Sequence, residues 1–266
     1  MTIQPEGKTV AKWTAFPQIG EYDFDAANTR GTWARLHTGD AEPLPAAVDV
    51  LEAWALFHSG EFHKCVLAGL KAGGAGITVA NKATCVYANY LEKKEKSRLD
   101  LFMDVVQRAE AQIAADANNP NAHYWLAYAL GRYSQGISVA KALAQGLGTK
   151  VKTALETTIA LQPRHADAHI ALGAFHAEVI DKVGSLIGSM TYGAKRDVGL
   201  KLFQEALKLN PGCAIALIEY ANGLVMLDGD KKLKDATRLY EQAAALKPAD
   251  AKERLDVEMA RAELAD

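Results

Sequence analysis

The chain has 266 residues, 49% of them hydrophobic and 23% charged, which is typical of a soluble globular protein. Thirty basic residues balance 32 acidic ones, and a net charge of −2 gives no reason to expect binding to nucleic acid or to an anionic membrane. The sequence has no stretch of eighteen apolar residues and no secretory signal, so it predicts no membrane span. We expect a cytoplasmic protein with buried, reduced thiols at Cys65, Cys85 and Cys213, which form no CxxC pair.

Residues 1–43 are predicted to form an N-terminal arm. Disordered tails are poor in aromatic residues, but this segment carries Trp13, Phe16, Tyr22, Phe24 and Trp33. We therefore expect an ordered arm that packs these rings onto the rest of the protein and shields its inner face. The nearby His37 and Asp40 are interpreted as partners in the local hydrogen bonds of a turn.

Residues 44–266 are predicted to form an all-α solenoid of about five irregular helical hairpins. From Pro45 onward, apolar residues recur every three or four positions among good helix formers. Segment 47–70, with Gly60 at its turn, is the first expected hairpin, and segments 77–92 and 98–120 form the second. The more polar helix at 249–266 is expected to cap the array.

One spacing occurs three times in the second half of the chain. Gaps of four, three and five residues separate the members of three sets: Val151, Leu155, Thr158 and Pro163; Gly199, Phe203, Ala206 and Pro211; Ala236, Tyr240, Ala243 and Pro248. Small residues then follow the prolines at Gly173 and Ala221, as in the first helix of a tetratricopeptide (TPR) repeat. The helix-ending prolines at 120, 163, 211 and 248 are 43, 48 and 37 residues apart, so inserts are expected near 133–150 and 182–196.

Three histidines in "RHADAHIALGAFHAEV" raise the question of a metal site. The four-residue spacing of His165 and His169 is one that zinc sites use on a helix. However, His169 and His176 lie two helical turns apart, where the repeat packs planar side chains, and His165 falls in the turn between repeats. We predict structural histidines, no metal and no cofactor. Because the GxxxxGK[ST], GxGxxG and GxSxG motifs are also absent, we expect no enzymatic activity.

Residues 100–248 resemble the regulator-of-microtubule-dynamics family of TPR-like proteins. The resemblance is carried by "NNPNAHYWLAYALGRYSQ", "VKTALETTIALQPRHADAHIALGAFHAEV" and "GLKLFQEALKLNPGCAIALIEYANGLVM", in their order, their helix-ending prolines and the places of the inserts. The TPR component of TRAP-type transport systems has a similar irregular arrangement. The resemblance implies a helical solenoid that binds protein partners and has no catalytic motif.

The inner helices of successive hairpins provide the candidate binding groove. TPR grooves that hold acidic peptide tails use Lys, Arg and Asn at these positions, and only Arg132 and Asn222 suit that role. The remaining candidates are apolar or aromatic: Tyr124, Tyr128, Ile170 and Ile218. We predict a protein-interaction scaffold that holds an unidentified protein or peptide segment in this groove. Two alternatives stay open: these residues are only core between helices, or a hydrophobic small molecule or lipid fills a cavity closed by the inserts.

Overall fold

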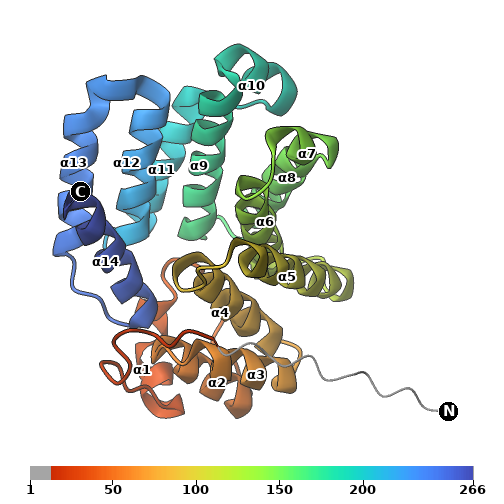
Figure 1. The fold of residues 1–266 in the computed structure, drawn as a ribbon. Helices are drawn as coiled ribbons and strands as arrows, with labels where there is room; N and C mark the ends of the chain where they lie inside the picture. The colour runs from red at the N-terminus through yellow and green to blue at the C-terminus, as the bar shows by residue number, and fades with distance from the viewer. Residues whose placement is uncertain (1–12, 266) are drawn as a thin grey trace.

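The structure is a computed structural model that describes residues 13–265, and this part of the chain contains helices but no β-strand (Figure 1). Five helical hairpins follow one another along the chain: α2 (Val48–His58) with α3 (Phe62–Ala72), α4 (Gly76–Tyr90) with α5 (Glu95–Ala115), α6 (Pro120–Gln135) with α8 (Leu147–Leu161), α9 (Ala166–Val183) with α11 (Arg196–Leu209), and α12 (Ala214–Asp228) with α13 (Leu233–Ala245). The predicted all-α, TPR-like solenoid is confirmed.

Further helices lie at both ends, at the inserts and in the turn between α12 and α13: α1 (Ala26–Leu36), α7 (Val139–Ala144), α10 (Ser185–Tyr192), the 3-10 helix η1 (Gly229–Lys232) and α14 (Ala251–Ala265). The inserts therefore fold as helices α7 and α10 between the two long helices of their hairpins. Within residues 13–265, none of the helices combines the length and the apolar character needed to cross a bilayer.

The small residues of the repeat lie where helices approach closely. Phe203 on α11 is fully buried, and its ring faces Gly173 on α9 and Gly223 on α12. A Cβ atom added at Gly173 would lie 3.1 Å from this ring, and one added at Gly223 would lie 2.6 Å from it. Glycine thus leaves room for one aromatic ring among three helices, which explains the spacing found in the sequence.

The C-terminal helix α14 closes the array by returning to the N-terminal hairpin (Figure 1). At the start of α14, the Asp250 Oδ2 atom lies 2.7 Å from the His58 Nδ1 atom of α2, and both side chains are buried. Glu253 and Asp256 make further bonds, to Arg35 at 2.7 Å and to the Tyr90 hydroxyl at 2.6 Å. The helix expected to cap one end of an open solenoid therefore also covers its other end.

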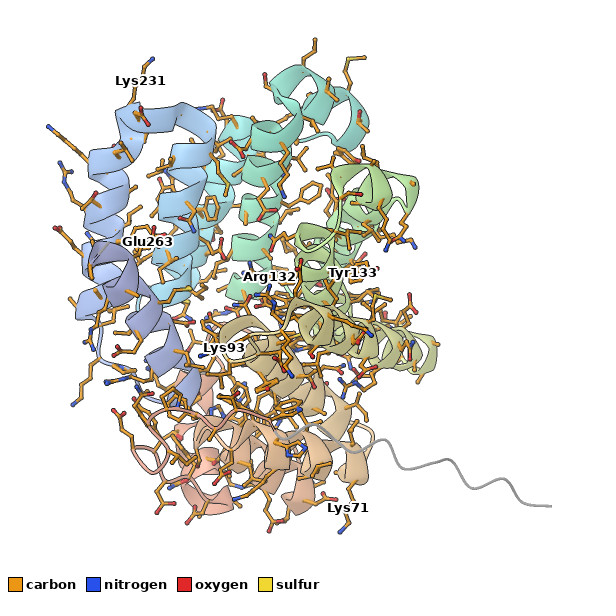
Figure 2. The ribbon with its side chains drawn as sticks, viewed as in Figure 1. Lys71, Lys93, Arg132, Tyr133, Lys231 and Glu263 are labelled. Atoms are coloured by element: carbon orange, nitrogen blue, oxygen red, sulfur yellow. The ribbon has the colours of Figure 1, made fainter. Side chains whose placement is uncertain are left out.

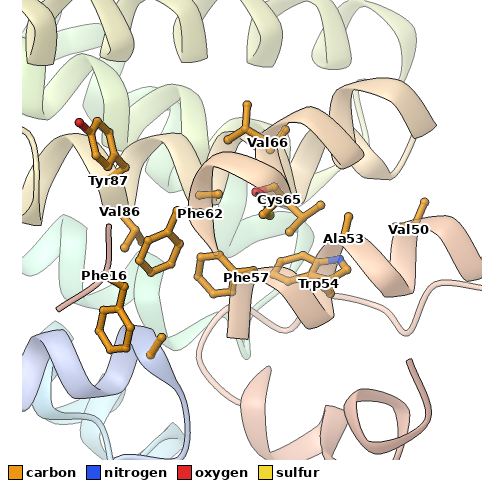
Figure 3. Packing of buried hydrophobic residues seen from close by; sticks show 14 of the residues in the cluster. Phe16, Val50, Ala53, Trp54, Phe57, Phe62, Cys65, Val66, Val86 and Tyr87 are labelled. Atoms are coloured by element: carbon orange, nitrogen blue, oxygen red, sulfur yellow. Dashed lines mark hydrogen bonds between the residues drawn. The ribbon is translucent and has the colours of Figure 1, made fainter. Parts of the chain in front are cut away.

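The described part of the N-terminal arm packs its aromatic rings in the core formed by α2, α3, α4 and the start of α14. Figure 3 shows Phe16 of the arm in this core. Trp13 stacks on Tyr87 with ring centroids 3.8 Å apart, while Phe16 and Trp33 are 2% and 7% exposed. The expected packing of the arm onto the solenoid is confirmed. The expected shielding of the inner face is not made by residues 13–43, none of which lines the cavity between the hairpins described below, and residues 1–12 lie outside the described part of the chain. The first hairpin has no preceding repeat to cover its apolar face, so the arm covers that face instead.

Candidate ligand-binding cavity

The inner faces of the hairpins enclose a central cavity of about 220 Å³. Side chains of α4, α6, α8 and α9 form its walls, α7 and α10 contribute at the inserts, and two residues of α12 and one of α14 also reach it. In Figure 2, Arg132 of α6 lies near the middle of the molecule, beside this space. The cavity is thus built by residues that are far apart in the sequence.

Two facing helices explain why the cavity exists. On α6, Tyr124 and Tyr128 are one helical turn apart and present their rings to the cavity. On α9, Ile170 and Ala174 are also one turn apart, and the short alanine side chain leaves space opposite the rings. The rings of Tyr124 and Tyr128 therefore form one wall of the cavity, and the space in front of them is not filled by other side chains.

The cations that line the cavity already have partners. Arg132 donates to the Glu219 carboxylate of α12 at 3.1 Å and lies over the ring of Tyr128, 5.4 Å from its centroid. The other lining cations form ion pairs as well: Lys82 with Asp40, Lys182 with Glu178, and Lys252 with Asp256. Asp167 is the one lining charge without an ion-pair partner among residues 13–265. The cavity therefore presents no spare positive charge to an acidic guest, and most of its remaining lining is apolar or aromatic.

A buried polar network lies next to the cavity and joins the arm to α4. Asp40 accepts hydrogen bonds from His37 Nδ1 at 2.9 Å and from Lys82 Nζ at 2.6 Å. Burial alone would raise the pKa of Asp40, but His37 and Lys82 together hold this pKa well below its usual value. The local bond between His37 and Asp40 is as predicted. Lys82 was not singled out from the sequence, because an isolated lysine in an apolar helix gives no signal of a partner 42 residues away.

Asn121 extends this network to α6 and α9. Its Nδ2 atom donates to the Asp40 carbonyl at 3.2 Å and to the Glu42 carboxyl at 2.5 Å, and its Oδ1 atom lies 2.9 Å from His165 Nε2. Burial and the nearby Asp40 charge raise the pKa of Glu42 to about 8. The network fixes the arm against α4, α6 and the start of α9.

The three histidines of segment 164–179 have the structural roles expected for them. His165 accepts a bond from the Ala168 backbone N–H at 3.1 Å and so caps α9, while His169 Nε2 lies 3.0 Å from the Pro163 carbonyl oxygen. His176 accepts from the Lys195 backbone N–H at 3.1 Å, and burial lowers its pKa to about 4. The predicted burial of His169 and His176 is confirmed. In the described part of the chain, no three His, Cys, Asp or Glu side chains come together as metal ligands could.

Comparisons with known proteins place the chain by its sequence and by its fold. The family model "regulator of microtubule dynamics protein 1-3" matches residues 77–265. The chain belongs to this family. No curated protein matches the sequence. A thermophilic TPR protein from Thermus thermophilus has a similar fold, with a TM-score of 0.56 and 15% identity over 80% of this chain and 97% of that one.

In this member of the regulator-of-microtubule-dynamics family, four of the six predicted groove residues line the cavity: Tyr124, Tyr128, Arg132 and Ile170. The other two, Ile218 and Asn222, are not among its lining residues. Ile218 is buried in the core shared by α12, α13 and α14, and Asn222 accepts a bond from the Tyr240 hydroxyl at 2.6 Å.

The structure turns a different face of α12 to the cavity from the one that the repeat spacing indicated. This helix presents Ile215 and Glu219 to the cavity, each three residues before a predicted site. The repeat spacing was transferred from the middle hairpins, but α12 packs against α14 as well as α13. That additional neighbour occupies the side of α12 that was expected to be open.

Proposed function

We propose that this protein is a non-enzymatic interaction scaffold that receives large apolar side chains of a partner segment in its central cavity. The observation that carries the proposal is the apolar, aromatic wall in a cavity whose lining cations are already paired. The TPR-like fold supports the general role of protein-interaction scaffold. The family name describes regulators of microtubule dynamics, and for this chain we propose the general part of that role, the binding of a protein partner.

The size of the cavity favours anchoring side chains over a whole helix. A cavity of about 220 Å³ is smaller than typical small-molecule pockets of about 300–1,000 Å³, and a helix with its side chains is about 10–12 Å across. One or two Leu, Ile or Phe side chains of the partner would fit, with the rest of the segment outside. Such buried anchors carry most of the binding energy in many interfaces.

An acidic peptide tail is a poorer guest. Arg132 is bound to Glu219, and Asn222 is bound to Tyr240. An acidic tail would have to replace these bonds, and separating a paired charge leaves its former partner unsatisfied. We therefore propose a neutral, apolar partner segment.

Selection from a phage-displayed peptide library, followed by calorimetric titration of the selected peptides, tests this proposal. We expect peptides rich in Leu, Ile and Phe. Ala174→Leu, which fills the cavity between α6 and α9, should weaken their binding about tenfold or more, equivalent to about 1.4 kcal/mol. The matched variant Ala160→Leu, at an exposed position of α8, should bind like the wild type. Selection of acidic peptides, or equal binding by Ala174→Leu, would contradict the proposal.

A second candidate function is the binding of a small hydrophobic molecule or lipid. The inserts favour this candidate because they form part of the cavity wall, through Val139 and Leu143 of α7 and Tyr192 of α10. Native mass spectrometry of the purified protein distinguishes the two candidates. A bound mass that is lost in Ala174→Leu would support the small ligand, whereas a bare chain that still binds the selected peptides would support the scaffold.

A further inference from the structure

The two inserts carry a concentration of exposed apolar side chains. On α10, Leu186, Ile187 and Met190 are 74%, 57% and 81% exposed, and their spacing places them on one face of the helix. On α7, Val139 and Leu143 are 52% and 49% exposed and lie one turn apart. Large apolar side chains exposed together mark a surface that meets another apolar phase.

The two insert helices are connected through the start of α8, which each of them contacts. Tyr192 at the end of α10 packs so closely on Gly148, in the first turn of α8, that a Cβ atom added there would lie 2.7 Å from its ring. Figure 1 shows α7 and α10 at the same side of the molecule, with α10 at its outer edge. We call the exposed side chains of residues 136–152 and 182–196 the insert surface.

The charge of the insert surface differs from that of the whole chain. The two segments contain six basic residues and no acidic residue, although the complete chain has a net charge of −2. Three of the six pair with acids of the flanking helices: Lys152 with Glu156, Lys182 with Glu178, and Arg196 with Asp228. The exposed Lys141, Lys150 and Lys195 form no ion pair within residues 13–265. Unpaired cations thus accompany the apolar side chains.

We propose that the insert surface docks the protein on an anionic lipid membrane, with the tips of Leu186, Ile187 and Met190 inserted among the acyl chains. Apolar side chains accompanied by lysines are the combination that binds peripheral proteins to bilayers that contain acidic lipids. A protein partner is less well matched, since the residues that dominate protein binding are enriched in Trp, Tyr and Arg and poor in Leu and Val, whereas Leu186, Ile187, Val139 and Leu143 are exposed here. Because Val139 and Leu143 also line the cavity, docking would turn the mouth of the cavity toward the bilayer.

This inference goes beyond the proposed function and does not depend on what the cavity binds. Co-sedimentation with phosphatidylcholine vesicles, prepared with and without phosphatidylserine, tests it. The full chain should sediment with the phosphatidylserine vesicles, should bind the neutral ones weakly, and should dissociate as salt is added. Leu186→Ser/Met190→Ser should abolish sedimentation, while Leu67→Ser/Leu70→Ser, at exposed positions of α3, should leave it unchanged.

A pair of charge variants provides an independent measurement. Because each lysine near an anionic surface changes the affinity about fivefold, Lys141→Glu/Lys195→Glu should weaken vesicle binding by about 25-fold or more. Lys71→Glu/Lys93→Glu, outside the inserts (Figure 2), should bind as the wild type does. The proposal fails if the wild type does not sediment with phosphatidylserine vesicles, or if the control variants lose as much binding as the insert variants. It also fails if the insert variants only dissociate a dimer seen by light scattering.

Discussion

Replacement of Asp250 by alanine should open the closed array at its C-terminal helix. Asp250 is 4% exposed; its Oδ2 atom bonds His58, and its Oδ1 atom accepts from the Glu253 backbone N–H at 2.8 Å. His58 lowers the pKa of this buried carboxyl against the effect of desolvation, so the pair is a charge-assisted bond. Loss of one partner from a buried pair costs about 3–5 kcal/mol, which here includes about 1 kcal/mol for the lost helix cap.

Hydrogen exchange measured by mass spectrometry reads this effect locally. In Asp250→Ala, the amides of α14 should lose about 100-fold or more of their protection, since each 1.4 kcal/mol corresponds to a factor of ten. The variant Asp250→Asn should lose less, because one amide oxygen can still serve one of the two donors.

Arg35→Ala is the matched control at the same closure. It removes an ion pair to Glu253 in which the Arg35 side chain is 50% exposed, so a change below about 1 kcal/mol is expected. If Asp250→Ala kept wild-type protection in α14, the buried pair of Asp250 and His58 would not be needed to hold α14 in place. The same conclusion would follow if Arg35→Ala lost as much protection as Asp250→Ala.

Four further predictions address packing, pH, the arm and metal binding. Ala221→Leu, at a fully buried position of α12, should destabilise the protein by about 1–3 kcal/mol through overpacking, and an unchanged melting temperature would refute the repeat register. The raised pKa of Glu42 means that its contribution to stability is present below about pH 4.5 and is lost as the pH rises through about 8. Chemical denaturation of Glu42→Gln should therefore show a smaller loss of stability between pH 5 and pH 9 than the wild type, and equal losses would contradict this cause. Deletion of residues 1–40 should expose the core around Trp54, raise binding of an apolar dye and lower stability; a deletion variant that stays stable and dye-silent would disprove the role of the arm. Elemental analysis should find no stoichiometric metal, and one zinc per chain that is lost in His165→Ala would overturn the structural role of the histidines.

Helix α12 shows the limit of transferring repeat spacing from one hairpin to the next. The candidate residues of α6 and α9 line the cavity because these helices lie in the middle of the array, with a hairpin on each side. At α12 the array meets α14, and Ile218 turns into that contact. Periodicity identifies the buried faces of a helix, but it does not state which neighbour covers each of them.

The sequence by itself determined the helical hairpins, the helix ends at Pro163 and Pro211, the inserts, and the burial of His169 and His176. These features depend on contacts within one hairpin or between successive hairpins, and such contacts leave a regular spacing in the chain. Only the tertiary structure decided the closure of the array by Asp250 and His58, which are 192 residues apart. It also decided the pairing of Lys82 with Asp40 and the side of the molecule that the arm covers. The physical reason is that these contacts join segments outside the repeat. The closure depends on the accumulated curvature of all five hairpins, and the arm has no repeat partner, so no local pattern of residues encodes either contact.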